Sequence, residues 1–208
     1  ILHQLFKRIN FLPIFRQYNY NQSFFSRPKP MTKSAMLAAM TEVLDLWLAA
    51  LDQYSEETFV RKPNDEDWSI GQVYQHLVLG TRVYHMRNIA SCLNNPQYTD
   101  KLPTDDGLKV LTSGEFPPVK IRIAPSPQYT PPQPEGVAQV REQLTALSAD
   151  LLALGEQVYD SESKGRMAHM RFGFLNASEW YHLIEMHFRH HLRQKENLDQ
   201  WLAGGVYA

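Results

Sequence analysis

The sequence predicts an all-α protein folded as a four-helix bundle, and three observations support this fold class. Four stretches carry apolar residues three and four positions apart, which is the spacing of an amphipathic helix. Two of these stretches begin with a capping box. A long proline-rich loop joins the second and third stretches and is compatible with a crossover connection in a bundle. The residue pattern contains no convincing sheet and no internal repeat.

The first two helices lie in the first half of the chain. One is predicted from Ser34 to about Tyr54, where eight apolar residues keep helical spacing. After the polar stretch "RKPNDED", Ser69 and Gln72 form a capping box that marks the start of the second helix. We expect this helix to end before Pro96.

The second half contains a long loop and two more helices. Seven prolines lie between Pro117 and Pro134, with one short extended piece, "VKIRI". A third helix is predicted over residues 137–158 and is followed by a glycine-containing loop, "DSESKGRMAHMRFGFLN". The last helix begins at Asn176, again with capping-box chemistry, and stops at Gly204–Gly205.

Composition is that of a soluble globular protein and excludes several functional classes. The chain of 208 residues is 43% apolar and 21% charged, with a formal net charge of -1. Such a balance does not indicate binding to nucleic acid or to an anionic membrane. Cys92 is the single cysteine, which fits a reducing compartment and excludes an internal disulfide. We therefore expect a cytoplasmic protein that acts on a small molecule.

Residues 1–30 differ from the rest of the chain and are treated as an N-terminal extension outside the fold. They contain no Asp or Glu and are rich in aromatic residues and arginine. Such a leader can be an organelle transit segment; the alternative is that Met31 is the natural start. We favour the second reading, because prolines interrupt the amphipathic pattern. Residues 31–208 then form the helical domain.

Three histidines have the spacing of a metal site. In "MHFRHHLRQ", His187 and His191 are four residues apart and share the apolar face of the last helix, whereas His190 is expected to face solvent. His76 lies on or beside the buried face of the second helix. Facing helices in a bundle can bring three such nitrogens together, and three ligands leave coordination positions for water or substrate.

Two other interpretations of these histidines stay open at this point. A buried histidine is more often a hydrogen-bonded core residue than a metal ligand. The four histidines of the last helix could instead form a surface that responds to protonation; these are His182, His187, His190 and His191.

Two segments resemble the DinB-like (YfiT-type) proteins. "WSIGQVYQHL" resembles the start of that family's second helix, in which a histidine follows a serine by seven residues, as His76 follows Ser69. "HMRFGFLNASEWYHLIEMHFRHHLRQ" resembles the family's closing segment. The residues that fall on the closing pattern are His169, Phe172, Gly173, Glu179, Trp180, His187, His191 and Gln194. The likeness spans about residues 34–203 and departs from the pattern at Met170, where relatives often have proline.

The resemblance implies an up-down-down-up four-helix bundle, often dimeric, that binds one divalent metal ion. The family's ligands carry over onto His76, His187 and His191, and zinc, nickel, iron and manganese are all compatible with them. We expect Gln194 to line the pocket or orient a ligand, and His169 to lie at the pocket mouth. The alternative for both is an ordinary packing role.

The resemblance and the open coordination position together imply a metal-dependent hydrolase that activates water. A metal-dependent transferase or isomerase that uses a low-molecular-weight thiol is an alternative, and so is a non-catalytic bundle that binds metal or a small molecule. No catalytic residue is assigned, because Glu185 is expected to point away from His187 and the sequence offers no other obvious general base.

Overall fold

The computed structural model describes residues 31–117 and 130–207, and these residues are mostly helical. The helical class predicted from the sequence is therefore confirmed. The extended piece "VKIRI" and the extension 1–30 lie outside the described residues. The elements are α2 (Lys33–Ala50), η1 (Leu51–Gln53), α3 (Glu56–Val60), α4 (Ile70–Gly80), η2 (Thr81–Met86), α5 (Arg87–Asn94), α6 (Asp105–Ser113), α7 (Val137–Asp160), β1 (Arg166–His169), β2 (Gly173–Asn176) and α8 (Ala177–Leu202).

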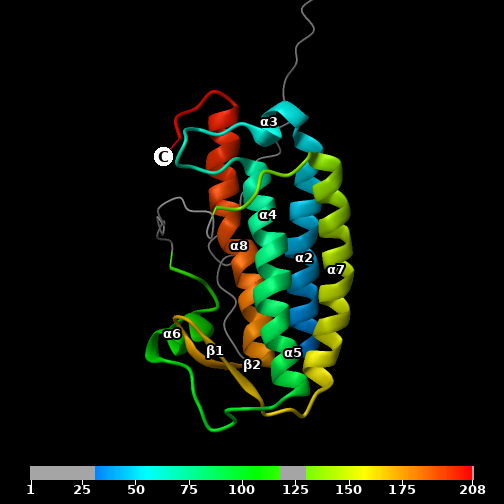
Figure 1. Ribbon diagram of the computed structural model, residues 1–208, viewed down its shortest axis with the longest axis vertical. Helices are drawn as coiled ribbons and strands as arrows, with labels where there is room; N and C mark the ends of the chain where they lie inside the picture. The colour runs from blue at the N-terminus through cyan, green and yellow to red at the C-terminus, as the bar shows by residue number, and fades with distance from the viewer. Residues whose placement is uncertain (1–30, 118–129, 208) are drawn as a thin grey trace, which may run out of the picture.

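Four long helical segments lie side by side (Figure 1). They are α2, the continuous segment α4–η2–α5, α7 and α8. In this view α2 and α8 run upward, whereas α4–η2–α5 and α7 run downward. The short strands and α6 lie together at the lower end, beside α8.

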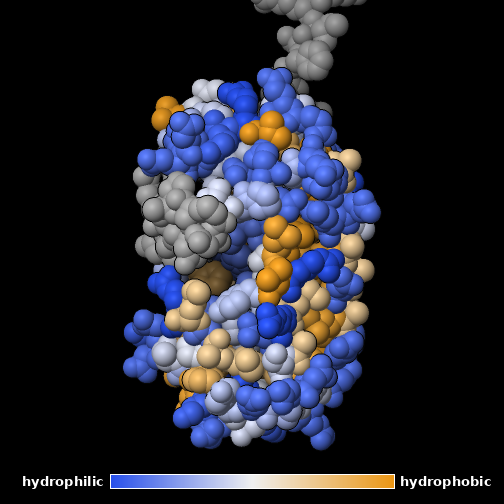
Figure 2. Space-filling model, viewed as in Figure 1, coloured by the Kyte–Doolittle hydropathy of each residue, from blue (hydrophilic) through white to orange (hydrophobic). Residues whose placement is uncertain are grey.

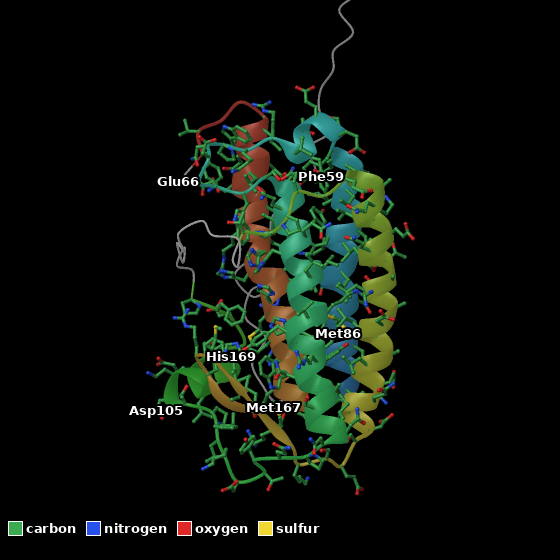
Figure 3. The ribbon with its side chains drawn as sticks, viewed as in Figure 1. Phe59, Glu66, Met86, Asp105, Met167 and His169 are labelled. Carbon is green, nitrogen blue, oxygen red and sulfur yellow. The ribbon has the colours of Figure 1, made fainter. Side chains whose placement is uncertain are left out.

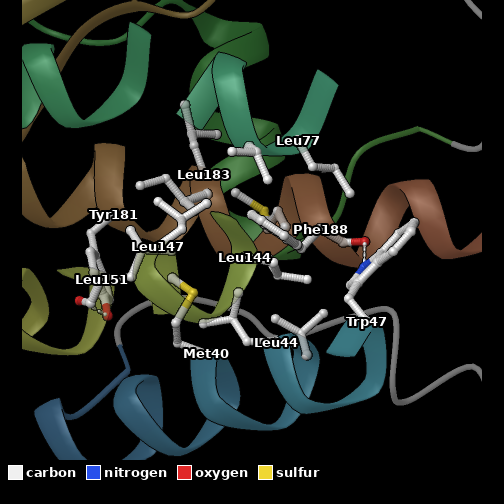
Figure 4. Packing of buried hydrophobic residues seen from close by; sticks show 14 of the residues in the cluster. Met40, Leu44, Trp47, Leu77, Leu144, Leu147, Leu151, Tyr181, Leu183 and Phe188 are labelled. Atoms are coloured by element: carbon white, nitrogen blue, oxygen red, sulfur yellow. Dashed lines mark hydrogen bonds between the residues drawn. The ribbon is translucent and has the colours of Figure 1, made fainter. Parts of the chain in front are cut away.

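The core is an apolar layer contributed by all four long segments (Figure 4). Met40 and Leu44 of α2 meet Leu144 and Leu147 of α7 in this layer, and none of these four side chains is more than 1% exposed. Burial of this kind stabilises a fold by about 25 cal/mol for each Å² of apolar surface removed from water.

The α2 helix with η1, residues Lys33–Gln53, is long and apolar enough to cross a membrane by length and composition. In this fold the apolar face of the helix lies in the core, where Met36, Met40, Val43, Leu44, Trp47 and Leu51 are buried. Trp47 is fully buried, and its indole N–H donates to the carbonyl of Phe188 at 3.1 Å. The outer surface in Figure 2 is largely hydrophilic, with apolar side chains gathered beside α4, where Leu79 and Val83 are exposed.

The two predicted capping boxes are present. The Ser69 hydroxyl accepts from the backbone N–H of Gln72 at 3.1 Å, and the Gln72 side chain accepts from the Ser69 N–H. Asn176 and Glu179 make the same reciprocal pair at the start of α8. These caps satisfy N–H groups that a helix start leaves without partners, so they fix where both site-bearing helices begin.

The structure differs from the expectation of one uninterrupted loop before the last helix. Within that segment, β1 and β2 pair antiparallel, with Arg166 opposite Asn176 and His169 opposite Gly173. Gly173 has a φ of 75°, a backbone conformation that favours glycine, and allows the tight return of the chain. Each strand is four residues long, and neither "RMAH" nor "GFLN" alternates apolar and polar residues, so alternation does not predict them.

Helix α6 was also not predicted. It begins at Thr104, whose side chain accepts from the N–H of Gly107, and it ends at Gly114 with a left-handed φ of 65°. Arg189 of α8 donates to the Gly114 carbonyl at 2.7 Å, and this contact holds the end of α6 against α8.

Candidate metal centre

His76, His187 and His191 lie together between α4 and α8. Nε2 of His187 is 2.9 Å from Nε2 of His76 and 3.1 Å from Nε2 of His191. The three potential ligand atoms all lie within 4.8 Å of one another, and each residue is half-buried. The structure therefore brings together the three histidines that the spacing and the family resemblance selected.

Two packing features hold the histidine-bearing faces in place. On α8, the carboxylate of Glu185 and the guanidinium of Arg189 form a fully buried ion pair, with atoms 2.6 Å and 2.7 Å apart. Glu185 thus pairs with Arg189 within α8. On α4, the ring of His76 lies against Trp68, with 5.1 Å between the ring centroids.

Gln194 determines which nitrogen of His191 carries the proton. Oε1 of Gln194 lies 2.8 Å from Nδ1 of His191. An amide oxygen only accepts hydrogen bonds, so Nδ1 of His191 is the protonated nitrogen. In a neutral imidazole this leaves a lone pair on Nε2, the atom that faces the other two histidines.

The histidines of the cluster are held in the neutral form. Burial lowers the pKa of His76 to about 4, and burial lowers the pKa of His187 and His191 well below the usual value. Repulsion among the clustered imidazoles acts in the same direction. Neutral imidazole is the form that binds a metal ion.

Three neutral histidines cannot satisfy both short N···N contacts among themselves. Each contact needs one proton, and Nε2 of His187 takes part in both. If this atom donates its proton to His191, it has no lone pair left to accept from His76. A divalent cation, in contrast, would take all three lone pairs. The donor set therefore fits a metal ion such as zinc, for which three histidines are a known catalytic ligand set.

His169 lies near this cluster but outside it. Figure 3 places it between the β1–β2 hairpin and the helices, close to the level of Met86. Its ring stacks on Phe172 at 4.5 Å and lies 5.2 Å from the ring of Trp180. Its Nδ1 accepts from the backbone N–H groups of Arg171 and Phe172, which together shape the hairpin turn.

The expectation that His190 faces solvent was wrong. The residue is half-buried, and its ring packs edge-on against Phe116, with 5.7 Å between centroids. Burial lowers its pKa to about 4. His182 is fully buried as well. These two residues therefore do not form the exposed surface that a protonation-dependent contact would need.

His85 and Tyr84 are site neighbours that the sequence did not reveal. The ring of His85 lies 5.5 Å from the ring of His187, and Tyr84 contacts both His85 and His169. Both residues belong to η2, a π-helical turn inside an otherwise α-helical segment. No periodic apolar signal predicts such a turn, but π turns are frequent at functional sites.

Comparison with known proteins identifies the family of the chain. No curated protein matched the chain. A model of the DinB superfamily matches residues 39–194, a range that includes His76, His187, His191 and Gln194. The match covers most of the chain and includes part or all of each of the four long helical segments, so the chain belongs to the DinB superfamily.

Proposed function

We propose that this protein binds a divalent metal ion through Nε2 of His76, His187 and His191 and is a metal-dependent hydrolase. The observation that carries the proposal is the convergence of these three nitrogens in neutral form. A bound divalent ion with an open position would lower the pKa of a water molecule and supply a nucleophile near neutral pH.

The chain's own residues have defined tasks in this proposal. Gln194 holds His191 in the tautomer that presents Nε2 to the ion. Trp68 covers one side of His76, and Trp180 and Tyr84 form an aromatic wall next to His85. Such surroundings exclude water and strengthen electrostatic interactions within the site.

The wider architecture belongs to the same proposal. The four long segments of Figure 1 are proposed to form a four-helix bundle of up-down-down-up topology, with residues 31–208 as the helical bundle domain. We further propose a cytoplasmic protein, with a homodimer as its possible assembly and a small molecule as its partner. Zinc, nickel, iron and manganese are the candidate ions, since imidazole nitrogen suits all of them.

Elemental analysis of tag-free protein tests metal binding. Wild-type protein and the His190→Ala control should each hold one equivalent of metal after reconstitution and dialysis, because His190 is half-buried but outside the triad. His187→Ala should hold almost none while keeping its helical circular dichroism. A wild-type protein that retains none of the four candidate ions would overturn the proposal.

A substrate screen then tests the reaction class. The metal-loaded protein should hydrolyse members of an ester and amide panel, and His187→Ala should not. Turnover that requires an added small thiol and an electrophile would show that the protein is a thiol-dependent transferase and not a hydrolase. Stoichiometric metal without turnover on either panel would identify a non-catalytic binding protein.

A further inference from the structure

His85 reaches the candidate metal centre because of the π-helical turn. Nine residues separate His76 from His85, and at about 100° for each residue an uninterrupted α-helix would place them on opposite faces. The π-helical turn η2 (Thr81–Met86) begins between them and contains His85, and it changes this angle. His85 is consequently only 8% exposed, with its ring 5.5 Å from that of His187.

A backbone carbonyl just before the π turn determines the tautomer of His85. Nδ1 of His85 lies 3.3 Å from the carbonyl oxygen of Gly80. A carbonyl oxygen only accepts, so Nδ1 carries a proton and donates it. In the neutral imidazole the lone pair of the ring is therefore on Nε2.

The protein itself leaves this lone pair available. Among the residues that the structure describes, none donates a hydrogen bond to Nε2 of His85. Two buried polar atoms close by in the fold also have no partner in that part of the chain: Oγ1 of Thr81, one turn earlier, and Nε1 of Trp180, whose ring lies 5.9 Å from that of His85. Buried polar groups without partners are rare in folded proteins and indicate a site for water or a ligand.

We propose that His85 positions the ligand of the metal centre by accepting a hydrogen bond at Nε2. The ligand class is then a small molecule with an N–H or O–H donor next to its metal-binding oxygen, as in an amide or a hydroxamate. This inference rests on the proposed metal centre. It goes beyond the three metal-binding histidines, because His85 contacts the bound small molecule and does not bind the metal ion itself.

His169 provides an internal comparison for the tautomer of His85. Its Nδ1 accepts from two backbone N–H groups, so its proton is on Nε2, the opposite arrangement. Long-range ¹H–¹⁵N correlation spectra of the zinc-loaded protein distinguish the two forms. We expect a protonated Nδ1 for His85 and a protonated Nε2 for His169. A proton on Nε2 of His85 would overturn the inference.

A pair of matched probes tests the hydrogen bond in the cobalt-loaded protein. Acetohydroxamate has an N–H donor, whereas N-methylacetohydroxamate has the same chelating oxygens without it. Binding is followed through the visible cobalt spectrum. Wild-type protein should prefer acetohydroxamate by about tenfold, the usual effect of one hydrogen bond.

Two variants separate the ligand contact from the structure of the π turn. His85→Asn keeps an amide donor for the Gly80 carbonyl, but its side chain ends short of the Nε2 position. This variant should therefore lose the preference and bind the two probes with about equal affinity. His85→Gln places an amide oxygen near the Nε2 position and should restore part of the preference. Both variants should bind one equivalent of cobalt, because neither alters the triad.

The outcomes distinguish this inference from the proposed function. Failure of wild-type protein to bind cobalt would contradict the metal centre itself. Stoichiometric cobalt with the same probe preference in wild type and His85→Asn would contradict only the role of His85. Stoichiometric cobalt with no binding of either probe at millimolar concentration would also contradict it.

Discussion

The amide oxygen of Gln194 and Nδ1 of His191 lie 2.8 Å apart, one turn along the same helix. This contact directs the lone pair of His191 toward His187 and His76. Gln194 therefore acts on the candidate metal centre through His191, in the way that outer partners of metal-binding histidines fix ring orientation.

Gln194→Leu should lower metal affinity by about 10- to 100-fold, because the replacement cannot hold the tautomer of His191. Competition with a zinc chelator of known affinity measures the change. Gln200→Leu is the matched control, since Gln200 is an exposed glutamine on the same helix. Equal zinc affinity for Gln194→Leu and wild type would contradict the assigned role.

Stability of the metal-free protein should depend on pH through its buried histidines. The pKa values of His85, His169 and His190 are lowered to about 4, whereas the unfolded value is 6.5. The unfolded chain binds more protons in this interval, so the free energy of unfolding should decrease as the pH falls from about 6.5 to about 4. Each fully buried histidine contributes up to roughly 3 kcal/mol to this decrease in the free energy of unfolding, and partly exposed histidines contribute less.

Urea unfolding of metal-free protein at a series of pH values measures this slope. In His190→Gln this slope should decrease by the contribution of one histidine, since glutamine does not titrate. Above about pH 7.5 the slope should vanish, because histidines whose unfolded pKa is 6.5 are then neutral in both states. Stability that stays constant down to about pH 4 would show that these imidazoles are not buried as described.

Much of the fold was predictable because it follows from local chemistry. The helix starts at Ser69 and Asn176 depend on capping boxes, each defined by two residues three positions apart. The inward pairing of His187 and His191 follows from their spacing on one helix. His76 comes from a distant segment, and its place beside that pair required both the bundle interpretation and the family resemblance.

The missed features depend on tertiary contacts. The half-buried position of His190 depends on Phe116, which lies beyond α6, an element that residue periodicity did not reveal. The place of His85 depends on one π turn, for which a sequence has no periodic signal. Thus the sequence selected the three histidines that the structure brings together, but not the neighbour that we propose to position the ligand.

Replacement by alanine at two helical glycines should change the stability of the protein in opposite directions. A Cβ at Gly155 would lie 2.5 Å from the hydroxyl oxygen of Tyr181 and 2.6 Å from Cδ2 of Leu37. The Tyr181 hydroxyl also donates to the buried Leu151 carbonyl, which limits its freedom to move. Gly155→Ala should therefore destabilise the protein by about 1–3 kcal/mol.

At Gly80 a Cβ would meet no atom within 4 Å, and the residue has helical φ and ψ. Gly80→Ala should stabilise the protein by up to about 1 kcal/mol, because alanine loses less backbone entropy in a helix. Thermal unfolding of both variants in parallel measures the contrast. A loss of stability for Gly80→Ala as large as that for Gly155→Ala would contradict the packing difference.

The buried ion pair of Glu185 and Arg189 should contribute strongly to the stability of the fold. Arg189→Met removes the partner of a fully buried carboxylate and the donor to the Gly114 carbonyl. The free energy of unfolding should decrease by about 3–5 kcal/mol. Arg82→Met is the control, because the Arg82–Asp150 pair is exposed and such pairs contribute about 0–1 kcal/mol.

The double variant Glu185→Leu with Arg189→Met separates charge from packing. If the loss in Arg189→Met comes from burying a carboxylate without its cation, removing the carboxylate as well should recover part of it. The remaining deficit then measures the lost contact between α8 and the end of α6. Urea unfolding of both single variants and the double variant gives the coupling energy. Additive losses would show that Glu185 and Arg189 stabilise the fold independently, contrary to their 2.6 Å contact.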